Sequence, residues 1–148
     1  MKNVKWIALA AVVWIGGCGS DNAVAPTESH ANAWVGDYSG TGSYHLSNGE
    51  SGVDKPTTLL ISAANLKQIL IDAKLVYGTR KADVAVGYAL VAPNSDDNME
   101  VEFRSQNTRI VIDLTKAGDV ISGVIVTTTL RPGGFWTEDQ RMTIEVSG

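Results

Sequence analysis

The feature that most constrains the fold is an alternation of apolar and polar residues with a period of two, which recurs from Trp34 to the C-terminus. In residues 99–104, 109–114 and 141–146, every second residue is apolar and most of its neighbours are charged or polar. Because successive side chains of a strand point to opposite faces, each stretch predicts a strand with one buried and one solvated face. No stretch shows a long helical period. The sequence therefore predicts an all-β fold.

Further strands are predicted for residues 34–44, 59–63 and 69–77, which also alternate, and for 83–91 and 119–130, which are apolar on both faces. Turn-forming Gly, Pro, Asn and Asp residues separate these stretches. About eight strands with short connections predict an antiparallel meander. We expect it to form a closed or nearly closed barrel, because closure removes exposed strand edges. A β-sandwich is the alternative.

The N-terminus carries Lys2 and Lys5, then an apolar run from Trp6 to Ile15, then two glycines before Cys18, the single cysteine of the chain. The run is too short to span a bilayer as a helix. This pattern resembles the signal of bacterial lipoproteins. The resemblance implies that residues 1–17 are a signal peptide that is removed, and that Cys18 becomes acylated and anchors the protein to a membrane. An ordinary secretory signal, with Cys18 unmodified, is the alternative.

Residues 18–33 contain no apolar period and are predicted to be the lipidated cysteine and a flexible tether before the domain at 34–148. In lipoproteins of Gram-negative bacteria, an aspartate after the cysteine favours the inner membrane. Gly19 occupies that position and favours the outer membrane. We therefore expect a lipid-anchored protein of the bacterial cell envelope. The net charge of −4, without basic runs, argues against a nucleic-acid partner.

Two segments of the domain carry a second resemblance. The segment Trp34-Val-Gly-Asp-Tyr-Ser-Gly40 and the segment Gly118-Asp-Val-Ile-Ser-Gly123 resemble a first and a late strand of small lipocalin-like barrels in bacterial lipoproteins. The resemblance implies a barrel that holds a small hydrophobic or amphipathic ligand. The alternative is a protein-interaction or inhibitor module with a filled core, whose protein partner the sequence does not identify.

Aromatic residues are the candidate ligand contacts. All four tyrosines fall on the predicted inward phase, Trp34 heads the inward row of the first strand, and two rings follow the glycine-rich turn at 132–134, where they could gate a cavity. The candidate ligand-binding residues are Trp34, Tyr38, Tyr44, Tyr77, Tyr88, Phe135 and Trp136. The alternative is that these rings fill the interior, because an eight-stranded barrel is just wide enough to be filled by its own side chains.

No catalytic constellation is visible. His30 falls in the predicted tether, His45 lies on the polar phase of the first strand, and neither has a metal-ligating neighbour at useful spacing. The acidic loop at 94–100 lacks the glycine and the distal glutamate of an EF-hand. We therefore expect a protein that is not an enzyme and that has no cofactor and no metal site.

Overall fold

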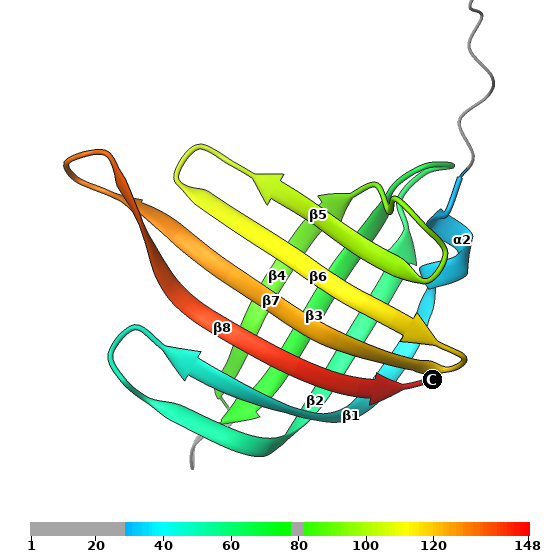
Figure 1. Ribbon diagram of the computed structural model, residues 1–148, viewed down its shortest axis with the longest axis horizontal. Helices are drawn as coiled ribbons and strands as arrows, with labels where there is room; N and C mark the ends of the chain where they lie inside the picture. Colours follow the sequence, from blue (N-terminus) through cyan, green and yellow to red (C-terminus); the bar gives the residue numbers. More distant parts are fainter. Residues whose placement is uncertain (1–28, 78–81) are drawn as a thin grey trace, which may run out of the picture.

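The computed structural model describes residues 29–77 and 82–148, and the side chains of these residues except 76–77 and 82–88. It is an all-β protein with eight antiparallel strands in one meander, which confirms the predicted fold class (Figure 1). The described elements are α2 (Ala31–Trp34), β1 (Gly36–Leu46), β2 (Ser51–Ala63), β3 (Ile69–Tyr77), β4 (Ala82–Val91), β5 (Asn98–Arg104), β6 (Thr108–Ala117), β7 (Val120–Arg131) and β8 (Phe135–Ser147).

The sheet curls into a nearly closed barrel. The strand order is β4-β3-β2-β1-β8-β7-β6-β5, so the first and last strands of the chain pair with each other, with Gly42 opposite Ile144. β4 and β5 lie at the two ends of this order and leave one unsealed seam. In Figure 1, β5 passes in front of β4 and runs in a clearly different direction. Among the described strands, β4 and β5 therefore each have one edge that faces the seam without a paired strand.

The two ends of the barrel differ in their connections. The β2–β3, β4–β5 and β6–β7 loops lie at one end together with α2, which we call the α2 end (Figure 1). The β1–β2, β5–β6 and β7–β8 hairpins lie at the opposite end, which we call the hairpin end. This division follows from the up-and-down meander, in which consecutive connections alternate between ends.

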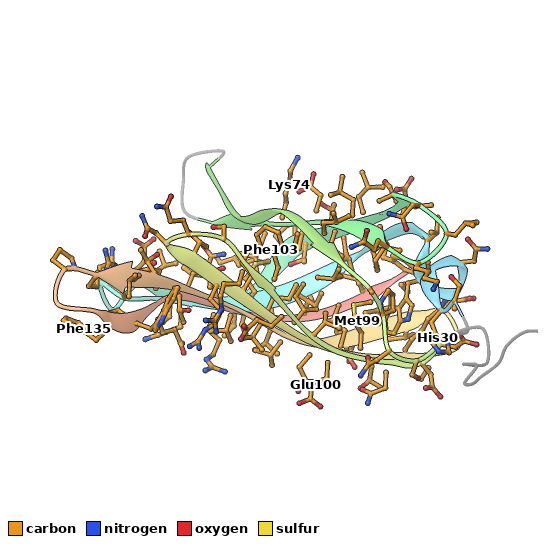
Figure 2. The ribbon with its side chains drawn as sticks, turned by 90° about the horizontal axis from the view of Figure 1, so that it is seen from above. His30, Lys74, Met99, Glu100, Phe103 and Phe135 are labelled. Atoms are coloured by element: carbon orange, nitrogen blue, oxygen red, sulfur yellow. The ribbon has the colours of Figure 1, made fainter. Side chains whose placement is uncertain are left out.

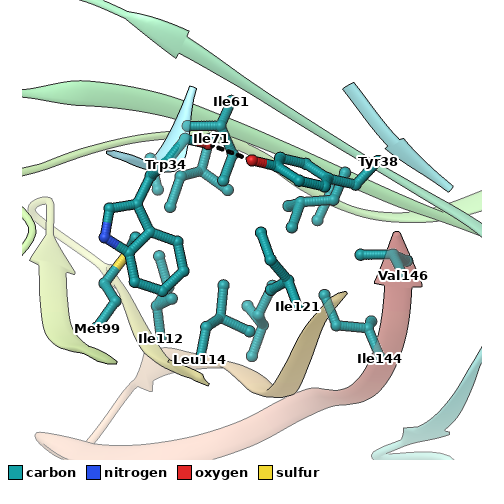
Figure 3. Packing of buried hydrophobic residues seen from close by; sticks show 14 of the residues in the cluster. Trp34, Tyr38, Ile61, Ile71, Met99, Ile112, Leu114, Ile121, Ile144 and Val146 are labelled. Carbon is teal, nitrogen blue, oxygen red and sulfur yellow. Dashed lines mark hydrogen bonds between the residues drawn. The ribbon is translucent and has the colours of Figure 1, made fainter. Parts of the chain in front are cut away.

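Alternation along the strands produces the core that the sequence predicted (Figure 3). The described inward side chains of all eight strands form one cluster. Each fully buried aliphatic side chain stabilises the folded state by about 1.5–3 kcal/mol. The largest fully buried side chains are Trp34, Leu59, Ile61, Ile69, Ile71, Leu75, Met99, Ile112, Leu114, Ile121, Ile125 and Met142.

The ordered barrel includes residues that the sequence assigned to the tether. Residues 31–33 of the predicted tether belong to a helix that ends at Trp34. Ala31 of that tether and Trp34 of the predicted domain are both buried, with exposed fractions of 1% and 0%. Lys116 Nζ donates a hydrogen bond to the carbonyl oxygen of Ala33, which holds α2 against β6. The prediction placed Trp34 at the start of the first strand, whereas β1 begins at Gly36. A helix of four residues is too short to produce a readable period, which explains the difference.

The predicted signal peptide at residues 1–17, Cys18 and residues 19–28 of the predicted tether lie outside the described residues. Among the residues that are described, no helix has the length and apolar composition of a membrane span.

Candidate functional site

Trp34 and Tyr38 close the α2 end of the barrel. Trp34 Nε1 donates a 2.7 Å hydrogen bond to the carbonyl oxygen of Ser95 in the β4–β5 loop. The Tyr38 hydroxyl donates a 3.1 Å hydrogen bond to the carbonyl oxygen of Trp34 (Figure 3). A buried indole N–H or phenol O–H needs such a partner. Both rings are therefore fixed by the backbone of the end that they close.

Tyr44 lies at the other end of the same strand. It is buried, as its predicted phase requires, and its hydroxyl lies 3.4 Å from Glu50 Oε1 beside the β1–β2 turn. Six residues of extended strand separate it from Tyr38, which corresponds to about 20 Å. Tyr77 belongs to β3 and Tyr88 to β4, but their side chains are outside those described. The two described tyrosines therefore lie at opposite ends of the inward face of β1.

Side chains occupy the described interior between these tyrosines. Ile144, Ile121 and Leu114 lie under Tyr38 and Trp34 in the packed cluster (Figure 3). A hollow of about 250 Å³ is lined by residues 37–39 of β1 and 58–60 of β2 and is open to solvent. A second hollow, of about 420 Å³, lies over the outward residues of β1, β7 and β8. Both hollows are surface features.

Phe135 and Trp136 begin β8 rather than lying in a loop. Phe135 is 59% exposed at the hairpin end. Trp136 pairs with Leu130 of β7, and the β7–β8 ladder shifts register between Thr127 and Thr128. This bulge adds one residue to β8, so that Trp136 points to the outer face although it shares even numbering with the inward Met142. Trp136 therefore lies on the outer face of the sheet, and Phe135, opposite Arg131, is exposed at the end of the hairpin.

Trp136 is the centre of a cluster on the outer face. Arg104, Arg109 and Thr128 are directly opposite one another across β5, β6 and β7, so they share one face of the sheet. The next residue of β6, Ile110, is buried, so this face is the outer one. The guanidinium carbons of Arg104 and Arg109 lie 5.6 and 5.2 Å from the ring centroid of Trp136. Both distances are within the range of cation–π attraction.

Charge pairing fixes the arginines of this outer-face cluster, which we define as Glu102, Arg104, Arg109, Thr128 and Trp136. Arg104 Nε and Nη2 lie 3.1 and 3.0 Å from Glu102 Oε1. Arg109 Nε donates a 3.2 Å hydrogen bond to Thr128 Oγ1 and lies 3.9 Å from Glu102 Oε2. The cluster covers Thr128, which is only 7% exposed although it points outward.

A second ion pair with an arginine lies on β8. Arg141 Nε and Nη2 donate hydrogen bonds of 3.0 and 2.9 Å to the two carboxylate oxygens of Glu138. The hydrogen bond to Glu138, followed by its charge, raises the pKa of the Arg141 guanidinium. Sequence reasoning missed both arginine sites. The members of the outer-face cluster come from four strands and meet only once the register is known. Glu138 and Arg141 belong to one strand, β8, and share a face only because the bulge lies between them.

The described residues offer no metal centre. Among them, no group of three or more His, Cys, Asp or Glu side chains is arranged to hold a metal ion. His30 Nδ1 lies 2.8 Å from Asp96 Oδ1, which links the segment before α2 to the β4–β5 loop. His45 is exposed on β1.

Comparison with known proteins gives little beyond these observations. No family model and no curated protein matches the chain. Among solved structures, the chain is similar to a redesigned β-barrel, with a TM-score of 0.48 and 11% sequence identity. That match covers 84% of this chain and 98% of the designed one.

Proposed function

We propose that this chain is a lipid-anchored, non-catalytic protein of the bacterial cell envelope, whose barrel binds a protein partner through the outer surface of its hairpin end. The observation that carries the proposal is the contrast between the two ends. Trp34 and the aliphatic core fill the described interior at the α2 end, whereas Phe135, Trp136 and several arginines lie on the surface at the hairpin end.

The N-terminal sequence supports the anchor. Lys2, Lys5, the apolar run and the Gly-Gly-Cys18 sequence have the order found in lipoprotein signals. Residues 19–28 reach at most about 35 Å when fully extended. Because the chain enters the barrel at α2 (Figure 1), an anchored barrel would have its α2 end near the membrane and its hairpin end free for a partner. Gly19 favours the outer membrane.

The surface chemistry of the hairpin end supports a protein partner. Trp, Tyr, Phe and Arg are enriched in protein–protein interfaces, where they supply most of the binding energy. Phe135 is exposed at the tip of the β7–β8 hairpin (Figure 2). The guanidiniums of Arg104 and Arg109 are held against Trp136, so little side-chain entropy remains to be lost when they bind.

The alternative is a barrel that holds a small hydrophobic or amphipathic ligand, as the lipocalin-like segments imply. At the α2 end, Trp34, Ile121 and Leu114 already occupy the interior, and Trp34 and Tyr38 close that end, so this part of the barrel leaves such a ligand no room. The described interior therefore favours the interaction module.

Site-specific photocrosslinking in cells of the source bacterium tests the interaction. A photoreactive phenylalanine analogue replaces Phe135, and the matched control replaces Leu66, which is 88% exposed at the α2 end. We expect a discrete adduct with a protein from position 135 and none from position 66. Equal labelling at both positions would refute a specific surface at the hairpin end.

Two mass measurements test the remaining parts of the proposal. Intact-mass spectrometry of the membrane-extracted protein should show acylated Cys18 at the new N-terminus, and Cys18→Ser should remove the added mass. Native mass spectrometry of the same protein should show no stoichiometric small molecule. A retained lipid that saturates at one site would instead support the ligand-binding barrel.

A further inference from the structure

The free edge of β5 can be assigned residue by residue. Asp97 and Ser105 flank β5 and both bond to β6: the Lys116 N–H donates to the Asp97 carbonyl, and the Ser105 N–H donates to the Thr108 carbonyl. The odd-numbered residues of β5 therefore bond to β6 as well. The backbone groups of an antiparallel strand alternate between its two neighbours. The even-numbered residues of β5 therefore direct their N–H and C=O groups into the seam.

Part of this edge is already satisfied by the β4–β5 loop. The Asn98 N–H donates to Ser95 Oγ, and the Glu100 N–H donates to Asn94 Oδ1, both at 3.2 Å. These side chains cap the first half of the strand. In the described part of the chain, β5 has no strand paired along its seam edge. The backbone groups of Glu102 and Arg104 therefore form the open part of the edge.

The side chains at this open edge are self-complementary. Glu102 and Arg104 lie on the outer face with Phe103 between them on the inner face, where it packs partly buried against the core (Figure 2). An antiparallel second copy could place Glu102 opposite its own equivalent, or opposite Arg104 of the second copy. Like charges directly opposite each other destabilise a strand pair, and opposite charges stabilise it.

We propose that the open edge of β5 pairs with β5 of a second copy of this chain, antiparallel and about a two-fold axis at Phe103. Glu102 then exchanges both backbone hydrogen bonds with Arg104 of the second copy, and their side chains carry opposite charges. In the alternative register, Glu102 lies opposite Glu102 of the second copy, so like charges face each other. That register also needs the Glu100 N–H as a donor, which already donates to Asn94 Oδ1. The caps and the charges therefore select the same register.

This register makes a prediction about Phe103 that no other pairing makes. Phe103 lies opposite its own equivalent at a non-hydrogen-bonded position, where Cα atoms are about 4.5 Å apart. A cysteine pair at that separation can form a disulfide. Val101, the neighbouring inward residue, lies opposite Ser105 of the second copy instead.

Disulfide trapping of the full-length protein in its native membrane tests the pairing. Phe103→Cys should give a disulfide-linked dimer on non-reducing gels, whereas the matched variant Val101→Cys and the wild-type protein should not. Because Phe103→Cys removes a partly buried ring, the double variant Val101→Cys/Ser105→Cys provides a second trap that keeps Phe103. Absence of a dimer from both traps, or equal yields from Phe103→Cys and Val101→Cys, would overturn the proposal.

Charge exchange in the Phe103→Cys background tests the register. Glu102→Arg or Arg104→Glu alone sets like charges opposite each other at two symmetric positions, which should lower the dimer yield about tenfold. The double exchange Glu102→Arg/Arg104→Glu restores opposite charges and should restore the yield. A double exchange that dimerises no better than the single variants would overturn the register. The trap depends on no other partner, so it can fail while the interaction at Phe135 stands.

Discussion

Substitution of Trp34 tests whether α2 is part of the folded barrel. The side chain is fully buried, and its Nε1 donates to the Ser95 carbonyl. An aromatic side chain of this kind buries about 150–250 Å², which at about 25 cal/mol per Å² corresponds to about 4–6 kcal/mol. Partial collapse of the cavity offsets some of this loss, and Trp→Ala substitutions in cores cost about 3–5 kcal/mol. We therefore expect Trp34→Ala to lower the free energy of unfolding by about 4 kcal/mol.

Thermal unfolding followed by circular dichroism measures the effect. For a domain of this size, about 4 kcal/mol corresponds to a melting temperature lower by about 12–16 °C. Trp136→Ala is the matched control, because it removes the same ring from the outer face and should cost only about 1 kcal/mol. Equal losses in the two variants, or a loss below about 1 kcal/mol for Trp34→Ala, would refute the placement of Trp34 as the residue that closes the α2 end.

Two further predictions concern the backbone and the N-terminal boundary. Gly123 has φ +150°, and a Cβ there would lie 2.1 Å from the Asp113 carbonyl oxygen. At Gly118, a Cβ would meet nothing within 4 Å. Gly123→Ala should therefore lower the denaturant midpoint of unfolding far more than Gly118→Ala. Equal midpoints would refute the close approach of β6 and β7. Removal of residues 29–33 should lower the melting temperature by several degrees, because Ala31 is buried and this segment bonds to three loops or strands. An unchanged melting temperature would instead support the sequence-based prediction of a tether at residues 18–33.

The strands and their buried faces could be predicted because burial itself produces the period of two. The rows that contain Tyr38 and Tyr44, or Ile110 and Ile112, are buried as their phase indicates. The burial of Trp34 was also predicted, but its place in a four-residue helix was not. Such a helix is held by contacts with distant loops, as the bond to Ser95 shows, and these contacts leave no local pattern.

The outer-face cluster could not be predicted, because it depends on registers among four strands. The β5–β6 hairpin is short enough to suggest that Arg104 and Arg109 are neighbours. Nothing local, however, sets Thr128 opposite Arg109, or shows that the bulge before Trp136 reverses its direction. Alternation alone assigns Trp136 to the interior, with Met142. A single extra residue in β8 moves the ring to the opposite face of the sheet.

The same bulge changes the chemistry inside the hairpin end. Asp139 is the extra residue and has no partner in the β7–β8 ladder. Its carboxylate accepts hydrogen bonds from the side chains of Thr129 and Arg131. Polar groups that bond one another in this way need no apolar ligand to cover them. One barrel end is therefore closed by an indole and the other is lined in part by a paired carboxylate, while the displaced aromatic ring is on the surface. This distribution supports the proposal that the protein binds a partner on the outside of the barrel.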